Sequence, residues 1–107
     1  MYVRLSRFAG LDPERIEETK RQFEEQALGQ LEQQPGFRGI TVGVNYKSGK
    51  ALAVTLWETE KDLRQSEKLA DEARTQAVST AKPSRDPIVD DYEVIVSRTA
   101  PEQTARS

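Results

Sequence analysis

The strand-like segments of this chain carry apolar residues on both faces, although only two helical segments accompany them. In each central segment, large side chains alternate with small ones. The large set is Ile40, Val42 and Val44 with Leu52, Val54 and Leu56, and the small set is Gly39, Thr41 and Gly43 with Ala51, Ala53 and Thr55. Helices on one side of a sheet leave its other side bare, and large bare apolar patches usually meet a partner. We therefore expect a small α+β subunit that forms a homodimer through its sheet.

Composition limits the chemistry that the chain can perform. Its 107 residues suit a single domain. Charged residues make up 32%, yet the net charge is only −2, and no basic stripe with aromatic residues indicates nucleic-acid binding. Without Cys or His, the chain has no thiolate nucleophile, no haem-ligating imidazole, no cysteine-based metal site and no copy of the commonest metal ligand. We therefore expect no metal site and no haem.

The hydrophobic pattern predicts the order β-α-β-β-α-β. Strands are expected over residues 2–8, 37–46, 51–57 and 92–96 because apolar residues alternate there. Asp12 and Thr59 are typical N-caps for the two helices, which lie between these strands. This order predicts the ferredoxin-like fold, with both helices on one face of a four-stranded antiparallel sheet. We expect one domain over residues 1–97 and a polar tail over 98–107.

The hairpin between the second and third strands leaves the strand register open. A connection of three residues would place all six large side chains on one face, and a connection one residue different would mix the large and small sets. The second helix carries a stripe of small residues, Ala70, Ala73 and Ala77. Together with the small face of the strands, this stripe could leave a cavity for a ligand.

Two short motifs allow a comparison with a particular protein family that has this fold. Pro35, Gly36, Phe37 and Gly39 follow the first helix, and the run Leu56–Glu60 enters the second. This arrangement resembles the dimeric α/β-barrel superfamily, and in particular the antibiotic biosynthesis monooxygenase (ABM) domains, over residues 1–97. The resemblance implies two sheets packed face to face as a barrel, with a cavity between the sheet and the helices of each subunit.

The resemblance also implies an activity. Members of this kind oxygenate an electron-rich aromatic or quinol-type substrate without a cofactor, or cleave haem. The haem-cleaving branch is disfavoured, because its Asn, Trp and His are matched here by Arg7, Ser66 and Gln76. We therefore expect a cofactor-independent monooxygenase, and keep open the alternative of a non-catalytic dimer that binds a small apolar ligand.

The cofactor-free branch of the family places Asn, Trp, Tyr and Arg around its cavity. By residue type, the resemblance implies Trp57 and Arg7 as catalytic residues, with Asn45 and Tyr92 in contact with substrate. We expect Phe23, on the apolar stripe of the first helix, to contact substrate as well. The structural alternatives are that Trp57 anchors the core, that Tyr92 packs at a strand end, and that Arg7 lies at the sheet margin.

Two further expectations concern charge and location. Asp90 and Asp91 are adjacent on a strand, so their side chains point to opposite faces and do not form one site. The N-terminal segment has no apolar run long enough for a signal peptide or membrane span, so we expect a cytoplasmic protein with no membrane contact.

Overall fold

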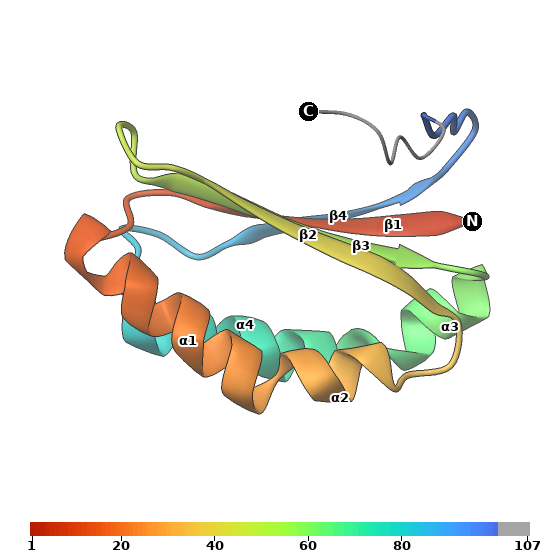
Figure 1. Cartoon of the computed structure of the whole chain (residues 1–107), viewed down its shortest axis with the longest axis horizontal. Coiled ribbons are helices and arrows are strands. Elements are labelled where there is room, and N and C mark those ends of the chain that lie inside the picture. The colour runs from red at the N-terminus through yellow and green to blue at the C-terminus, as the bar shows by residue number, and fades with distance from the viewer. Residues whose placement is uncertain (101–107) are drawn as a thin grey trace, which may run out of the picture.

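The computed structural model describes residues 1–100 and contains one antiparallel sheet with helices on one side (Figure 1). The elements in chain order are β1 (Tyr2–Phe8), the 3-10 turn η1 (Pro13–Arg15), α1 (Ile16–Gln26), α2 (Leu28–Glu32), β2 (Phe37–Asn45), β3 (Lys50–Trp57), α3 (Glu60–Gln65), α4 (Glu67–Ala81) and β4 (Ile88–Glu93). The strand order is β2-β3-β1-β4. The predicted ferredoxin-like α+β fold is confirmed.

Both predicted helices begin at their predicted caps. The first consists of the turn η1 followed by α1 and α2, and the second is divided into α3 and α4. The Asp12 side chain accepts a hydrogen bond from the Glu14 amide, and the Thr59 hydroxyl accepts one from the Asp62 amide. The first helix breaks at Ala27, where φ is −121°, and the second breaks at the buried Ser66. Neither break involves Pro or Gly, so local sequence gives no sign of them.

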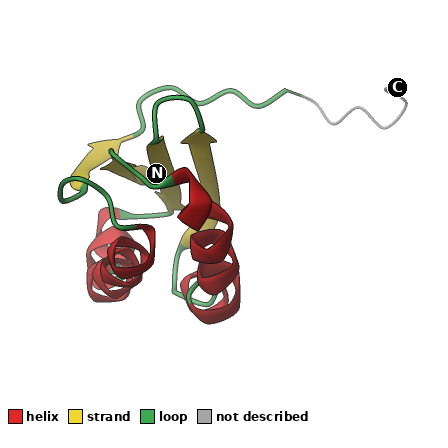
Figure 2. Ribbon diagram, turned by 90° about the vertical axis from the view of Figure 1, so that its left-hand side faces the viewer, coloured by secondary structure: helices red, strands yellow, loops and turns green. Residues whose placement is uncertain are grey.

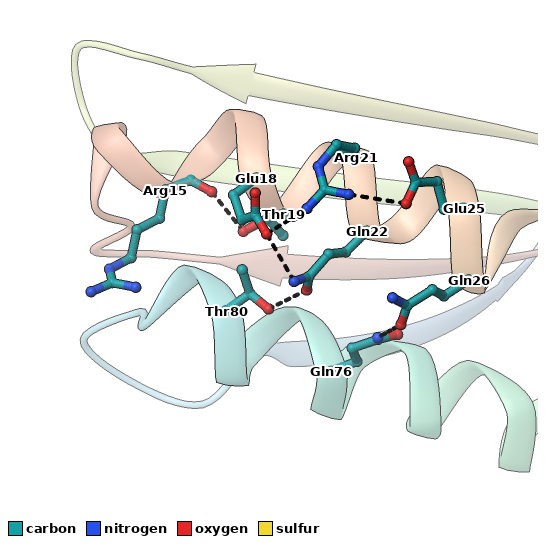
Figure 3. Close-up of polar contacts among 9 residues, drawn as sticks. All are labelled: Arg15, Glu18, Thr19, Arg21, Gln22, Glu25, Gln26, Gln76 and Thr80. Carbon is teal, nitrogen blue, oxygen red and sulfur yellow. Dashed lines mark hydrogen bonds and ion pairs between the residues drawn. The ribbon is translucent and has the colours of Figure 1, made fainter.

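Helices α1 and α4 lie side by side beneath the sheet, and polar side chains join them (Figures 2 and 3). Thr80 donates a hydrogen bond of 2.6 Å to Gln22, and Gln76 donates one to Gln26. Gln22 in turn donates to Glu18 within α1. These contacts lie between the helices, which leaves the apolar sides of both helices for the sheet.

The β2–β3 hairpin has a connection of four residues, 46–49, so of the two registers that the sequence leaves open, the one that mixes the large and small sets is present. Asn45 pairs with Lys50, and consequently Val42 pairs with Ala53 and Ile40 with Thr55. Residues that pair directly across antiparallel strands share a face. The large residues of β2 and the small residues of β3 therefore face the helices together, while Leu52, Val54 and Leu56 lie on the opposite face.

The last strand lies earlier than predicted, over Ile88–Glu93 instead of residues 92–96. It pairs with β1 at the sheet edge, and the Val94 amide adds one more hydrogen bond, to the Met1 carbonyl. After that bond the chain leaves the sheet on the side away from the helices (Figure 1), and Ile95 and Val96 are almost fully exposed. Residues 98–100 form no helix or strand, and the rest of the predicted tail lies outside the described residues. The domain limit at residue 97 stays a prediction.

One face of the sheet carries no helix anywhere in residues 1–100 (Figures 1 and 2). We call it the outer face; its large apolar residues are Val3, Leu5, Leu52, Val54, Leu56, Ile88 and Tyr92. Leu52, Ile88 and Tyr92 are 41–51% exposed. The expectation that the helices leave one apolar face bare is confirmed for this part of the chain. Among residues 1–100, no helix has the length and apolar character needed to cross a membrane.

Candidate functional site

A cavity of about 470 Å³ lies between the helix-facing side of the sheet and helices α1, α2 and α4. Small side chains account for its volume. They are Ala51 and Ala53 of β3 and Ala70, Ala73, Ala77 and Ala81 of α4. The predicted contribution of the second helix to a cavity is confirmed. Of the small strand residues, only those of β3 contribute, because the register turns Gly39, Thr41 and Gly43 to the outer face.

The remaining cavity wall is mainly apolar. It includes Phe8, Ile16, Phe23, Leu28, Leu31, Ile40, Val42 and Val44. Val42 and Tyr46, at the edge strand β2 and the hairpin, are 53% and 60% exposed although they line the cavity. Lys20 and Glu24 of α1 are exposed lining residues as well. The cavity therefore opens between β2 and α1, and these four residues form its mouth.

A buried arginine is the main polar feature of the cavity wall. Arg4 faces the helices from β1, is 3% exposed, and lines the cavity. One terminal nitrogen donates to the Leu63 carbonyl at 2.8 Å, and the other donates to the Ser66 hydroxyl at 3.0 Å. Its Nε lies 3.5 Å from the Asp91 carboxylate. These contacts join β1 to the junction of α3 and α4 and explain why Ser66 is buried where the helix breaks.

The surroundings of Arg4 oppose its positive charge. Burial lowers the pKa of its guanidinium below its ordinary value, and the nearby Arg74 lowers it further, whereas Asp91 and Glu67 raise it. Arg74 also lines the cavity, with its side chain 15% exposed and its nearest carboxylate, on Asp71, at 3.6 Å. Two guanidinium groups therefore contribute to a wall that is otherwise mostly apolar.

Trp57 is fully buried and is not among the residues that line the cavity. Its indole N–H donates to the Thr55 hydroxyl at 2.9 Å, and its ring meets that of Phe37 edge-on at 5.6 Å. The indole N–H is thus directed to a side chain of the cavity wall. Thr55 does line the cavity, so Trp57 is one residue removed from it.

Of the five site residues predicted from sequence, only Phe23 lines the cavity. Arg7 lies on the outer face, 3.1 Å from Asp90, which corrects the expectation that it points into a cavity. Tyr92 pairs with Val3 on that face. The side chain of Asn45 accepts hydrogen bonds from the backbone of Lys47 and Ser48 in the hairpin. The structure therefore does not bring Arg7, Asn45 and Tyr92 to the cavity. Strand alternation is the physical reason for their placement.

Arg4, Ser6 and Arg74 line the cavity although the sequence did not predict them there. A usable signal was the alternation of β1, in which Arg4, Ser6 and Phe8 share the face opposite to Val3 and Leu5. The expectation that Asp90 and Asp91 point to opposite faces is confirmed, because Asp90 contacts Arg7 and Asp91 contacts Arg4.

Comparisons with known proteins give structural likeness alone. No protein-family model and no curated protein sequence matches the chain. Among solved structures, it is similar to a monooxygenase from the gene ActVA-Orf6 of Streptomyces coelicolor, in complex with nanaomycin D. The TM-score is 0.75 and the identity 14%, over 94% of this chain and 92% of that one.

Two further structures support the same fold. A protein of Deinococcus radiodurans, provisionally named an antibiotic biosynthesis monooxygenase, gives a TM-score of 0.71 at 14% identity over 95% of this chain and 100% of its own. SnoaB, a cofactor-independent oxygenase from Streptomyces nogalater, gives 0.65 at 18% identity over 94% and 97% of the two chains. At such identities the likeness shows that the chain has the fold of these proteins.

Proposed function

We propose that this chain, which has the fold of the antibiotic biosynthesis monooxygenases, is a member of that family and oxygenates a small aromatic or quinol-type substrate without a cofactor. The observation that carries the proposal is the cavity of about 470 Å³ beneath the sheet. Its size falls in the range of small-molecule sites, and its wall is mainly apolar with a few polar groups, as such sites usually are.

A reaction of this kind asks little of the protein, which suits a chain without His or Cys. The substrate, as its carbanion or phenolate, transfers one electron to O₂, and the resulting radical pair combines to form a C–O bond. The hydroperoxide then loses water and leaves a carbonyl, so that one oxygen atom enters the substrate and the other leaves as water. The substrate is the only reductant. The protein supplies orientation, exclusion of water and stabilisation of the anion.

In this proposal the residues take roles that follow from their positions. Phe23 keeps its predicted role as a substrate contact. Trp57 acts as a positioning residue, because its N–H holds the Thr55 hydroxyl in the cavity wall. We assign the stabilisation of the substrate anion to Arg4, in place of Arg7, the arginine that the resemblance implied as catalytic.

Oxygen uptake with a panel of quinols tests the proposal. We expect uptake with at least one quinol, and we expect Ala77→Leu, which places three more carbons in the cavity, to reduce it strongly. Lys61→Ala, on the exposed surface of α3, is the matched control and should leave uptake unchanged. The proposal fails if no quinol is consumed faster than in buffer, or if both variants behave alike.

We also propose that two copies of the chain pack through their outer faces, as in a dimeric α/β barrel. The seven large apolar residues of this face support the dimer. Arg7 and Asp90 also lie on this face, and their opposite charges cancel in an ion pair. Arg7, Asn45 and Tyr92 would then lie at or near the subunit contact. We expect a dimer in sedimentation at micromolar concentration and a monomer for Val54→Lys, whereas Gln30→Lys on α2 should remain dimeric. A folded wild-type monomer would refute the dimer.

A second candidate function is a dimer that binds a small apolar ligand without catalysis. The predominance of apolar side chains in the cavity wall favours it. Thermal shifts across an apolar ligand library separate the two functions, since a ligand that raises the melting temperature while no quinol supports oxygen uptake indicates a binder. The cytoplasmic location stays a prediction in either case.

A further inference from the structure

We infer that the cavity recognises a ligand with an anionic oxygen group, a carboxylate or a phenolate, which sits against Arg4 and Arg74 while the apolar body fills the space beside the alanines of α4. This inference deepens the proposed function, because it concerns the ligand of the same cavity. It rests on the placement of charge around that cavity.

The first observation is that Arg4 keeps hydrogen-bonding capacity. A guanidinium has five N–H donors. Three are accounted for by the Leu63 carbonyl, the Ser66 hydroxyl and the Asp91 carboxylate. One donor on each terminal nitrogen is left, on a group that is 97% buried and lines the cavity. The Ser66 hydroxyl and the Leu63 carbonyl are hydrogen-bonded to each other at 2.7 Å and occupy the edge between the two terminal nitrogens, so the two remaining N–H groups lie on different edges, and each can donate a charge-assisted hydrogen bond to an anionic oxygen.

The second observation is that the carboxylates near the two arginines lie toward solvent. Asp91 and Asp71 are 48% and 73% exposed, and neither lines the cavity. Within residues 1–100, Glu24 is the single carboxylate in the cavity wall, and it lies at the mouth, where Lys20 also lies. The interior wall therefore carries two positive groups and no negative group among the residues that the structure describes.

The third observation is that an anion would relieve an electrostatic cost. Burial and the proximity of Arg74 both disfavour the charge on Arg4, as the lowered pKa of its guanidinium indicates. A buried charge is tolerated when a partner of opposite sign and hydrogen bonds accompany it. Ser6 provides a further donor, because this residue is 4% exposed and lines the same cavity.

The test uses ligands that do not react with oxygen. We expect 2-naphthoate to bind the wild-type protein in isothermal titration calorimetry about tenfold or more tightly than its neutral isostere 2-naphthamide. A third probe, 2-naphthol, separates the two sources of the anion. If the cavity recognises phenolates, the affinity for 2-naphthol should increase as the pH rises toward the range in which its hydroxyl group ionises. If the cavity recognises carboxylates alone, that affinity should not increase.

Matched variants locate the preference. Arg74→Gln should reduce the preference for naphthoate over naphthamide to about twofold, whereas Arg74→Lys should retain part of it. Arg64→Gln is the control, because Arg64 also pairs with a carboxylate on its own helix but lies on the exposed surface of α3. Arg4→Met is a second variant. If it fails to fold because it loses the Leu63 and Ser66 contacts, Arg74→Gln still decides the question.

Equal affinity of the wild-type protein for naphthoate and naphthamide would overturn the inference, and so would a preference that Arg74→Gln leaves unchanged. These outcomes are distinct from failure of the proposed function. A selective anion site without oxygen uptake refutes the monooxygenase and leaves the inference intact. Oxygen uptake without anion selectivity supports the monooxygenase and refutes the inference.

Discussion

Filling the cavity should stabilise the protein, and the sign of this effect tests whether the space beneath the sheet is real. Ala77 lines the cavity from the middle of α4, so Ala77→Leu adds three carbons to the wall. Burial contributes about 0.8 kcal/mol per carbon, or about 2.4 kcal/mol in total when it is complete. Because the cavity opens at one side, we expect about 1–1.5 kcal/mol. For a chain of this size, this gain raises the melting temperature by roughly 4–10 °C.

Ala27→Leu is the matched control for this measurement. Ala27 is 4% exposed, lies between α1 and α2, and does not line the cavity. The same three carbons there have no space, and overpacking of this kind costs about 1–3 kcal/mol. Urea and thermal unfolding at one fixed protein concentration measure both variants, since dimerisation would make stability depend on concentration. If Ala77→Leu loses as much stability as Ala27→Leu, the interior is filled and the cavity argument is refuted.

Three further predictions concern individual contacts. Ser66→Ala removes one acceptor from the buried Arg4 and should lower the free energy of unfolding by about 1–3 kcal/mol in urea denaturation; an unchanged midpoint would contradict the proposed junction. Trp57→Phe should lower it by about 1.5–3 kcal/mol in the same assay, because the indole is fully buried. Arg21 holds the pKa of the Glu18 carboxyl below 4.5, so the contact stabilises the fold above that pH and is lost as pH falls through the lowered pKa. Glu18→Gln should therefore have a lower melting temperature than wild type at pH 7 and one nearly equal to it at pH 3.

The sequence predicts the first three strands within one residue at each end, because their signals are local. Alternating side chains mark the strands, and Pro35, Gly36 and the hairpin residues interrupt them. The fourth strand is misplaced for a physical reason. Residues 92–96 are the more typical strand sequence, but an edge strand needs only one neighbour and tolerates charges such as Asp90 and Asp91. Its position is set by pairing with β1, which is about 85 residues away in sequence.

The candidate site is less predictable than the fold, because its key contacts join distant parts of the chain. Arg4 and Ser66 are 62 residues apart, and their hydrogen bond explains both the buried guanidinium and the break between α3 and α4. Neither residue belongs to a recognisable local motif. Phe23 is predictable because it belongs to the apolar stripe of its own helix, whereas Arg7, Asn45 and Tyr92 were chosen by residue type and lie on strands or turns whose orientation depends on register.

The length of the β2–β3 connection ultimately explains why the cavity has its present wall. With four residues in the connection, each residue of β2 from Gly39 onward pairs with a β3 residue of opposite parity, so the large side chains of β2 stand beside the alanines of β3. The alanines leave volume, and Ile40, Val42 and Val44 give it an apolar edge. A connection of three residues would turn these three side chains to the outer face and put Gly39, Thr41 and Gly43 beside the cavity. One residue more or less in this connection therefore decides which side chains of β2 line the cavity. With four residues the edge is apolar, and with three it would be wider and more polar.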